Sequence, residues 1–265
     1  MALVSFVSAK GSPGATTTAM LSAALWPAPV LLLDADPAGG DVAARWPTAG
    51  GGVLDAERGL LPLLTSARRG LSAEQVLAQA QPASGGTPVV CGLGAPEQAR
   101  AAERSWPSLA AAVLDVTRGA GGTGPTDVLV DGGRLGAHPV HLPLLRESTA
   151  VVLVVRDDVA GVLHARERLR VLAGALRRGD GLLPRVGVVV VGDLQRGDAD
   201  GSARVLLEVG EWVEDFGRLP LDAAGARVFD GARTARPERT ALVRAGRAVV
   251  RAVAAAAAGR PRDAA

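Results

Sequence analysis

The residue whose type and position most directly suggest chemistry is Lys10, the only lysine among 29 basic Lys and Arg residues. It lies in a glycine-rich turn, residues 9–17, directly after the hydrophobic run of residues 3–7. A chain that otherwise uses arginine retains lysine where a compact ammonium fits better than a planar guanidinium. A close contact with a phosphate group is one such position. The backbone N–H groups of such a turn, and of a helix beginning there, also point at an anion. The turn therefore predicts a phosphate-binding loop.

The same turn contains a candidate metal ligand and one departure from the usual pattern. Thr16 stands where its hydroxyl could ligate a phosphate-bound Mg²⁺. An ordinary phosphate loop has a lysine directly before that threonine, and this chain has Ala15 there. The residues of this turn predicted to line the phosphate site are Lys10, Gly11, Ser12, Gly14, Ala15, Thr16 and Thr17.

Carboxylates end two further hydrophobic runs. Asp34 and Asp36 follow the second run, and Asp131 ends a later one, where it is followed by Gly132 and Gly133. Buried acids need a cation or several hydrogen bonds. Acids at strand ends near a phosphate loop therefore favour a metal-assisted phosphate site. The alternative for the first pair is a plain Asp-Pro turn.

The elements that must position these residues alternate as βαβ units. Short β-branched runs predict strands at residues 3–7, 30–33, 88–91, 128–130, 151–155 and 186–191, and helical spacing predicts helices at 16–25, 72–79, 97–116, 159–176, 203–215 and 238–257. This order predicts an α/β fold with a mostly parallel sheet flanked by helices on both faces. Ligands are then expected at the carboxyl ends of the strands. We expect a single domain over residues 1–258 and a disordered tail at 259–265.

Three segments resemble the deviant Walker A ATPases of the MinD/ParA type, in the SIMIBI class of P-loop proteins. Their loop motif runs Lys-Gly-Gly-X-Gly-Lys-Thr-Thr. Lys10 matches its first lysine, Ser12 replaces the second glycine and Ala15 replaces the second lysine. Asp-Ala-Asp-Pro at residues 34–37 resembles the start of the first switch, and residues 127–133 resemble the Walker B strand and second switch.

The resemblance implies two catalytic residues, Lys10 and Asp36. Asp36 would orient or activate the attacking water, with Asp34 in a supporting role. Lys10 would reach across a dimer interface to the nucleotide of the partner.

The resemblance also implies a metal and nucleotide site. Thr16, Asp34 and Asp131 would hold Mg²⁺, partly through water, while Gly132 and Gly133 would let the backbone approach the γ-phosphate. The implied cofactors are ATP and Mg²⁺, bound weakly or lost because Ala15 replaces lysine. Relatives often place an asparagine that contacts the base where this chain has Gly192-Asp193, so base specificity does not carry over.

The function that the resemblance implies is that of an ATP-binding positioning or partitioning factor. It would have weak or degenerate ATPase activity, act as a nucleotide-linked homodimer, and serve a pilus or secretion, division or partitioning machine. One alternative is a pseudo-ATPase scaffold without hydrolysis, which Ala15 favours. Another is a metabolic P-loop enzyme similar to dethiobiotin synthetase or the amidases.

Composition limits the other classes of function. The single Cys91 provides no internal disulfide, and the three histidines have no metal-ligand spacing. Neither a signal peptide nor an apolar span is visible, so a cytoplasmic protein is expected, with peripheral membrane or nucleoid association as an option.

Positive charge gathers near the end of the chain. Between Arg227 and Arg262 there are nine arginines against Asp230 and Glu238. The candidate contacts to nonspecific DNA or an anionic membrane are Arg244, Arg247 and Arg251. A solvated face of an amphipathic last helix is the alternative, which we favour.

Overall fold

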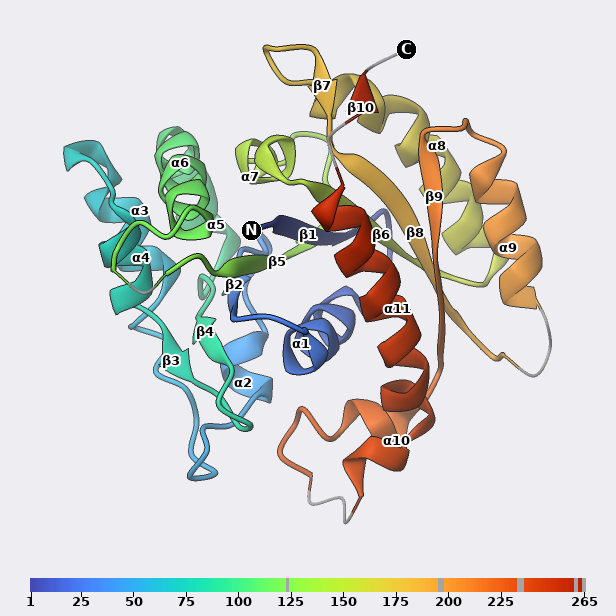
Figure 1. Cartoon of the computed structure of the whole chain (residues 1–265), viewed down its shortest axis with the longest axis horizontal. Coiled ribbons are helices and arrows are strands. Elements are labelled where there is room, and N and C mark those ends of the chain that lie inside the picture. The colour runs from blue at the N-terminus through green and yellow to red at the C-terminus, as the bar shows by residue number, and fades with distance from the viewer. Residues whose placement is uncertain (123, 195–197, 233–235, 260–261, 264–265) are drawn as a thin grey trace.

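One eight-stranded sheet organises the chain (Figure 1). The computed structural model describes all residues except 123, 195–197, 233–235, 260–261 and 264–265. In spatial order the strands are β3 (Gln81–Pro82), β4 (Pro88–Val90), β2 (Val30–Asp34), β5 (Asp127–Arg134), β1 (Leu3–Ser8), β6 (Ala150–Arg156), β8 (Arg185–Gly192) and β9 (Val213–Pro220). All neighbours pair in parallel except β3 and β4. The predicted α/β fold with a mostly parallel sheet is confirmed.

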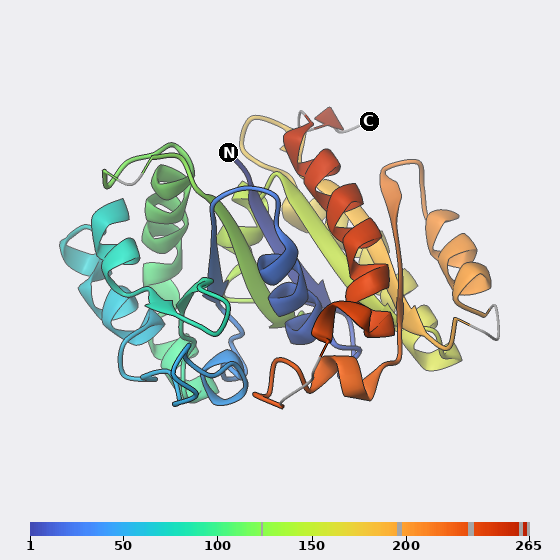
Figure 2. The same cartoon turned by 60° about the horizontal axis from the view of Figure 1, so that its bottom comes forward.

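Helices cover both faces of this sheet, because its strands are apolar on both sides. In β1, Leu3 and Val7 belong to one buried cluster, and Val4 and Phe6 belong to the other. The second face is covered by α1 (Ala15–Leu25) and α11 (Ala241–Ala258), with the short helices α2 (Val42–Arg45) and α10 (Ala223–Ala226) near its lower end (Figure 2).

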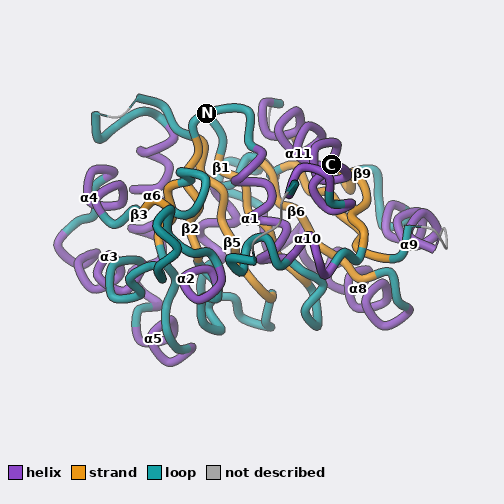
Figure 3. The backbone as a smooth tube through the Cα atoms, turned by 90° about the horizontal axis from the view of Figure 1, so that it is seen from below, coloured by secondary structure: helices purple, strands orange, loops and turns teal. Residues whose placement is uncertain are grey.

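The opposite face carries the remaining α-helices, and the strands run between the two helical layers (Figure 3). They are α3 (Leu60–Ser66), α4 (Ala73–Ala78), α5 (Pro96–Ala101), α6 (Trp106–Thr117), α7 (Leu142–Glu147), α8 (Val159–Leu176) and α9 (Asp198–Leu207). Short 3-10 turns lie at Ala67–Arg69, Glu103–Ser105 and Pro237–Arg239. No helix within the described ranges is both long enough and apolar enough to span a membrane.

Two predicted helices differ from the structure. The predicted helix over residues 97–116 is divided into α5 and α6, because Pro107 lacks an N–H and is accommodated only at the start of a helix. The predicted helix over residues 203–215 ends at Leu207, and its last three residues begin β9, which pairs with β8. Pairing along a sheet edge here overrides local helical spacing.

The end of the chain contains a second, very small sheet. Within the tail expected at residues 259–265, β10 (Arg262–Asp263) pairs antiparallel with β7 (Leu182–Leu183). Residues 260–261 and 264–265 lie outside the described residues.

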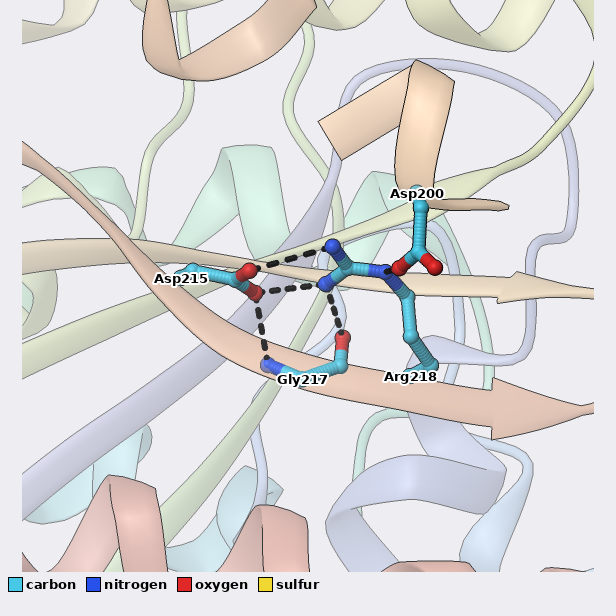
Figure 4. Close-up of polar contacts among 4 residues, drawn as sticks. All are labelled: Asp200, Asp215, Gly217 and Arg218. Atoms are coloured by element: carbon cyan, nitrogen blue, oxygen red, sulfur yellow. Dashed lines mark hydrogen bonds and ion pairs between the residues drawn. The ribbon is translucent and has the colours of Figure 1, made fainter. Parts of the chain in front are cut away.

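The edge strand β9 contains a bulge that Arg218 fastens to its surroundings (Figure 4). The register with β8 shifts after Val188, and Gly217 has a φ of 113°. The Asp215 carboxylate accepts hydrogen bonds from the Gly217 N–H at 2.9 Å and from the Arg218 guanidinium. Arg218 also donates to Asp200 of α9 at 3.1 Å. These hydrogen bonds hold β9 in place, and the end of β9 forms part of the candidate site.

Candidate functional site

The predicted phosphate loop joins β1 to α1 as an open turn. Gly11 and Gly14 have φ values of 69° and 96°, which glycine adopts readily, and a Cβ atom at either would meet nothing within 4 Å. Gly14 is the N-cap of α1 and provides no side-chain acceptor for the first N–H groups of the helix. Those N–H groups have no partner within the helix and are directed at whatever fills the turn. The geometry suits an anion.

The side chains of the loop differ in their surroundings. Ser12 is exposed, whereas Ala15 is only 7% exposed and packs in the core beneath α1. Thr16 and Thr17 are half-buried. The Thr17 hydroxyl accepts a hydrogen bond from Arg45 of α2 at 3.2 Å. At the position of the family's second lysine, this chain therefore has an apolar side chain, Ala15, that packs in the core.

Lys10 makes an unexpected contact within its own chain. Its Nζ lies 2.8 Å from Nε2 of His164, which is on α8. Because an ammonium group can only donate, Nε2 of His164 is the acceptor in this contact. Lys10 itself is exposed. The side chain expected to cross a dimer interface thus has a resting position on α8.

Asp34 is fully buried at the end of β2 and holds the loop that follows. Its carboxylate accepts the backbone N–H of Val42 at 3.1 Å and, more weakly, that of Asp36 at 3.4 Å. A Cβ atom at Gly40 or Gly92 would overlap this carboxylate. Burial raises the pKa of Asp34 well above its usual value, and the nearby charge of Asp131 raises it further. Asp34 anchors the segment predicted to be the first switch.

Asp36 and Gly133 lie against each other. A Cβ atom at Gly133, where φ is 57°, would overlap the Asp36 carboxylate, so only glycine fits. Asp36 Oδ1 also accepts the N–H of Ala38 at 2.8 Å. Burial raises the pKa of Asp36, and the guanidinium of Arg134 acts in the opposite direction. The structure therefore brings the two predicted switch segments together.

Asp131 lies between β1 and β2, opposite Phe6 and Asp34 in the parallel registers. Its Oδ1 accepts the Gly133 N–H at 3.2 Å, while its buried Oδ2 has no hydrogen-bond partner. Burial raises the pKa of Asp131 to about 6, and the Thr16 hydroxyl lowers it in part. The neighbouring Gly132 packs on Val7 and leaves no room for a side chain.

These groups fit a magnesium ion better than a fully protein-bound metal. The unpaired Oδ2 of Asp131 and the hydroxyl of Thr16 are oxygen donors, and the carboxylate cluster is short of positive charge. Across the described residues, no three His, Cys, Asp or Glu side chains converge on one point. Mg²⁺ normally keeps several waters and uses few protein ligands. The donor set therefore suits Mg²⁺ bound together with phosphates.

Two cavities flank the phosphate loop. One, of about 230 Å³, is lined by residues 10–13 and by the beginning of α8. The other, of about 330 Å³, lies between the loop and the end of β9, with Val191, Leu219 and Leu242 among its apolar walls. Its size is that of a small-ligand pocket. Gly192 and Asp193 line a separate neighbouring cavity of about 910 Å³.

Sequence reasoning missed His164, Arg45 and Asp230. Arg45 donates to Asp230 at 2.8 Å as well as to Thr17, which ties α2 to the segment after α10. His141, which precedes α7, is buried with neither ring nitrogen hydrogen-bonded, and burial lowers its pKa to about 4. No local motif in the sequence marks these residues, because their contacts come from distant segments.

Comparisons of whole structures identify similar folds. No protein-family model and no curated protein matches the chain. A ParA family ATPase from Chlorobium tepidum TLS has a TM-score of 0.72 and 16% identity, over 94% of this chain and 98% of that one. The McdA(D38A)–ATP complex from Cyanothece has a TM-score of 0.70 and 13% identity, over 95% and 96%.

A third similar structure contains a nucleotide with magnesium. The septum site-determining protein MinD from Pyrococcus horikoshii OT3, complexed with Mg-ADP, has a TM-score of 0.63 and 16% identity, over 93% of both chains. Over nearly its whole length, this chain has the P-loop fold of the MinD/ParA ATPases.

Proposed function

We propose that this chain is a MinD/ParA-like positioning or partitioning factor that binds Mg·ATP, hydrolyses it weakly and works as a nucleotide-linked homodimer. The observation that carries the proposal is the open loop at Gly11 and Gly14, together with the half-buried carboxylate of Asp36 and the buried carboxylate of Asp131. This arrangement supports a single site in which anion donors and metal ligands would act together.

Binding follows from the groups around the loop. The N–H groups at the start of α1 would hold phosphate oxygens, and Thr16 and Asp131 would hold Mg²⁺, partly through water. Asp34 supports the site by fixing the first switch, and the 330 Å³ cavity accommodates the base. When bound, ATP supplies the phosphoanhydride bond and Mg²⁺ neutralises the phosphate charge.

Hydrolysis relies on Asp36, whose carboxylate lies against Gly133 where the second switch bends. Asp36 orients a water and accepts its proton, which its raised pKa favours. Ala15 supplies no cation to the transferring phosphate. Because such electrostatic stabilisation is commonly worth a few kcal/mol, turnover is expected to be slow.

Dimerisation is supported by the surface next to Lys10. Val159 and Leu163 of α8 are 78% and 53% exposed, on the part of the helix that carries His164. A second copy of the chain would cover these apolar side chains and give Lys10 a phosphate partner in place of His164. The partner machine is a pilus or secretion, division or partitioning apparatus, and the protein is cytoplasmic or peripheral at a membrane or the nucleoid.

A second candidate function is a pseudo-ATPase scaffold, which the buried methyl of Ala15 favours. Calorimetric titration with Mg·ATP separates the two. Loss of one charge-assisted phosphate contact costs about 1.5 to 3 kcal/mol, so weak binding by the wild type is expected. Ala15→Lys should bind more tightly and hydrolyse on the order of a hundredfold faster. Absence of heat and of a thermal shift at millimolar nucleotide would support the scaffold.

A further inference from the structure

The phosphate loop of this chain lacks the lysine that Ala15 replaces, and two nearby cations are already engaged. Lys10 contacts His164, and Arg45 contacts Asp230 and Thr17. A third cation, Arg134, lies near Asp36, whose pKa its positive charge lowers. None of these contacts directs a free positive charge at the interior of the loop.

Arg156 occupies a different position. It is the last residue of β6, the strand that pairs with β1, with Ser8 opposite Val154. It lines both cavities that flank the loop, and it shares this property with only Ser12 and Pro13 among the lining residues. Arg156 therefore stands beside the phosphate loop, at its boundary with α8.

The charge of Arg156 is available for a ligand. Its side chain is exposed, and it forms no hydrogen bond or ion pair with any residue that the structure describes. The nearest carboxylate along the chain that lines the same cavity, Asp158, is used as a cap, accepting the Gly161 N–H at 2.6 Å. An arginine fork can bind two phosphate oxygens at once.

We propose that Arg156 supplies, within the same chain, the positive charge for nucleotide phosphates that Ala15 does not. The proposal rests on the proposed function, since it assumes that a nucleoside triphosphate occupies the loop. A guanidinium at the end of β6 replaces an ammonium at the start of α1, and it approaches the phosphates from the α8 side of Ser12 and Pro13.

Calorimetric titration with Mg·ATP at fixed salt tests this assignment. Arg156→Ala and Arg156→Gln should weaken binding at least tenfold, and Arg156→Lys should weaken it less. Arg170→Ala is the matched control, because it removes an exposed arginine of α8 that, among the described residues, pairs with Glu167 alone. It should change the dissociation constant by less than about twofold. Thermal denaturation checks that each variant is folded.

A double variant makes the test specific. If Arg156 and a lysine at position 15 serve the same phosphates, Ala15→Lys should strengthen binding more in the Arg156→Ala background than in the wild type. If the wild type binds Mg·ATP with measurable heat, but Arg156→Ala and Arg170→Ala bind it with equal affinity, the role of Arg156 is overturned and the proposed function is not. Absence of heat for the wild type would overturn the proposed function together with it.

Discussion

At the scale of single residues, the site combines three acidic side chains with few compensating cations. Asp34, Asp36 and Asp131 all have raised pKa values, because burial disfavours their charged forms. Hydrogen bonds from nearby backbone N–H groups lower these pKa values in part, and the positive charge of Arg134 does the same at Asp36. Such an arrangement is electrostatically unfavourable without a ligand. A bound divalent cation would relieve it, which is consistent with a site made for Mg²⁺ with phosphate.

This imbalance predicts a pH dependence of stability. The pKa of Asp131 is about 6 in the folded chain and 3.8 in the ordinary state, so the folded state binds the proton more tightly. Without ligand, this group therefore makes stability rise as pH falls from about 7 towards 4. Asp131→Asn should be more stable than the wild type at pH 7, by up to about 3 kcal/mol, and the difference should vanish near pH 4.

Urea unfolding of both proteins across that pH range, without Mg²⁺ or nucleotide, measures the difference. A wild type that is the more stable protein at pH 7, or a difference independent of pH, would show that Asp131 is not a strained carboxylate. Adding Mg·ATP should stabilise the wild type and not Asp131→Asn.

The sequence predicts some residue contacts and not others. The closeness of Asp36 to Gly133 follows from the motifs, because both motifs end strands that are neighbours in a parallel sheet. The contacts of Lys10 with His164 and of Arg45 with Asp230 join residues 154 and 185 positions apart. They depend on how helices pack, which local spacing does not encode.

At the scale of elements, the bulge in β9 is held by the contacts of Arg218. Arg218 has an 18% exposed side chain and forms a two-pronged contact with Asp215, whereas Asp200 is 77% exposed. Arg218→Ala should destabilise the fold by about 1 to 2 kcal/mol, since the bulge loses the hydrogen bonds from the guanidinium to Asp215. Asp200→Ala should cost less than about 0.5 kcal/mol.

Chemical denaturation of both variants tests this difference. Equal losses would mean that the link to α9, rather than the bulge, is what Arg218 stabilises. Because β9 leads into the 330 Å³ cavity, Arg218→Ala should also weaken nucleotide binding.

The last helix, α11, has the amphipathic form that its spacing predicts. Leu242, Val249 and Val253 are buried, while Arg244, Arg247 and Arg251 are exposed. If the exposed arginines contact DNA or anionic lipid, Glu at all three positions should abolish salt-sensitive binding to nonspecific DNA or anionic vesicles. Absence of binding by the wild type at low salt would leave a solvated helix face.

The elements that the sequence predicts least well are those that tertiary contacts shape. The split between α5 and α6 could be anticipated from Pro107. The start of β9 could not, since residues 203–215 have helical spacing throughout and only pairing with β8 makes the last of them a strand.

At the scale of the whole molecule, alternation of buried strands and helices is enough to predict the sheet, and the order of the motifs predicts where its ligands bind. The fold does not identify a partner. The similar structures are only 13% to 16% identical to this chain, so they establish its architecture and not its function. The function has to be argued from the residues of the site.

The central claim is that nucleotide controls self-association through Lys10. Sedimentation velocity of the wild type and Lys10→Ala, with and without millimolar Mg·ATP, tests it most directly. The account predicts a monomer without nucleotide, a dimer of the wild type with Mg·ATP, and a folded monomer of Lys10→Ala under both conditions, because an exposed loop lysine contributes little to stability. A wild type whose association is unchanged by Mg·ATP, or a variant that dimerises as the wild type does, would contradict it.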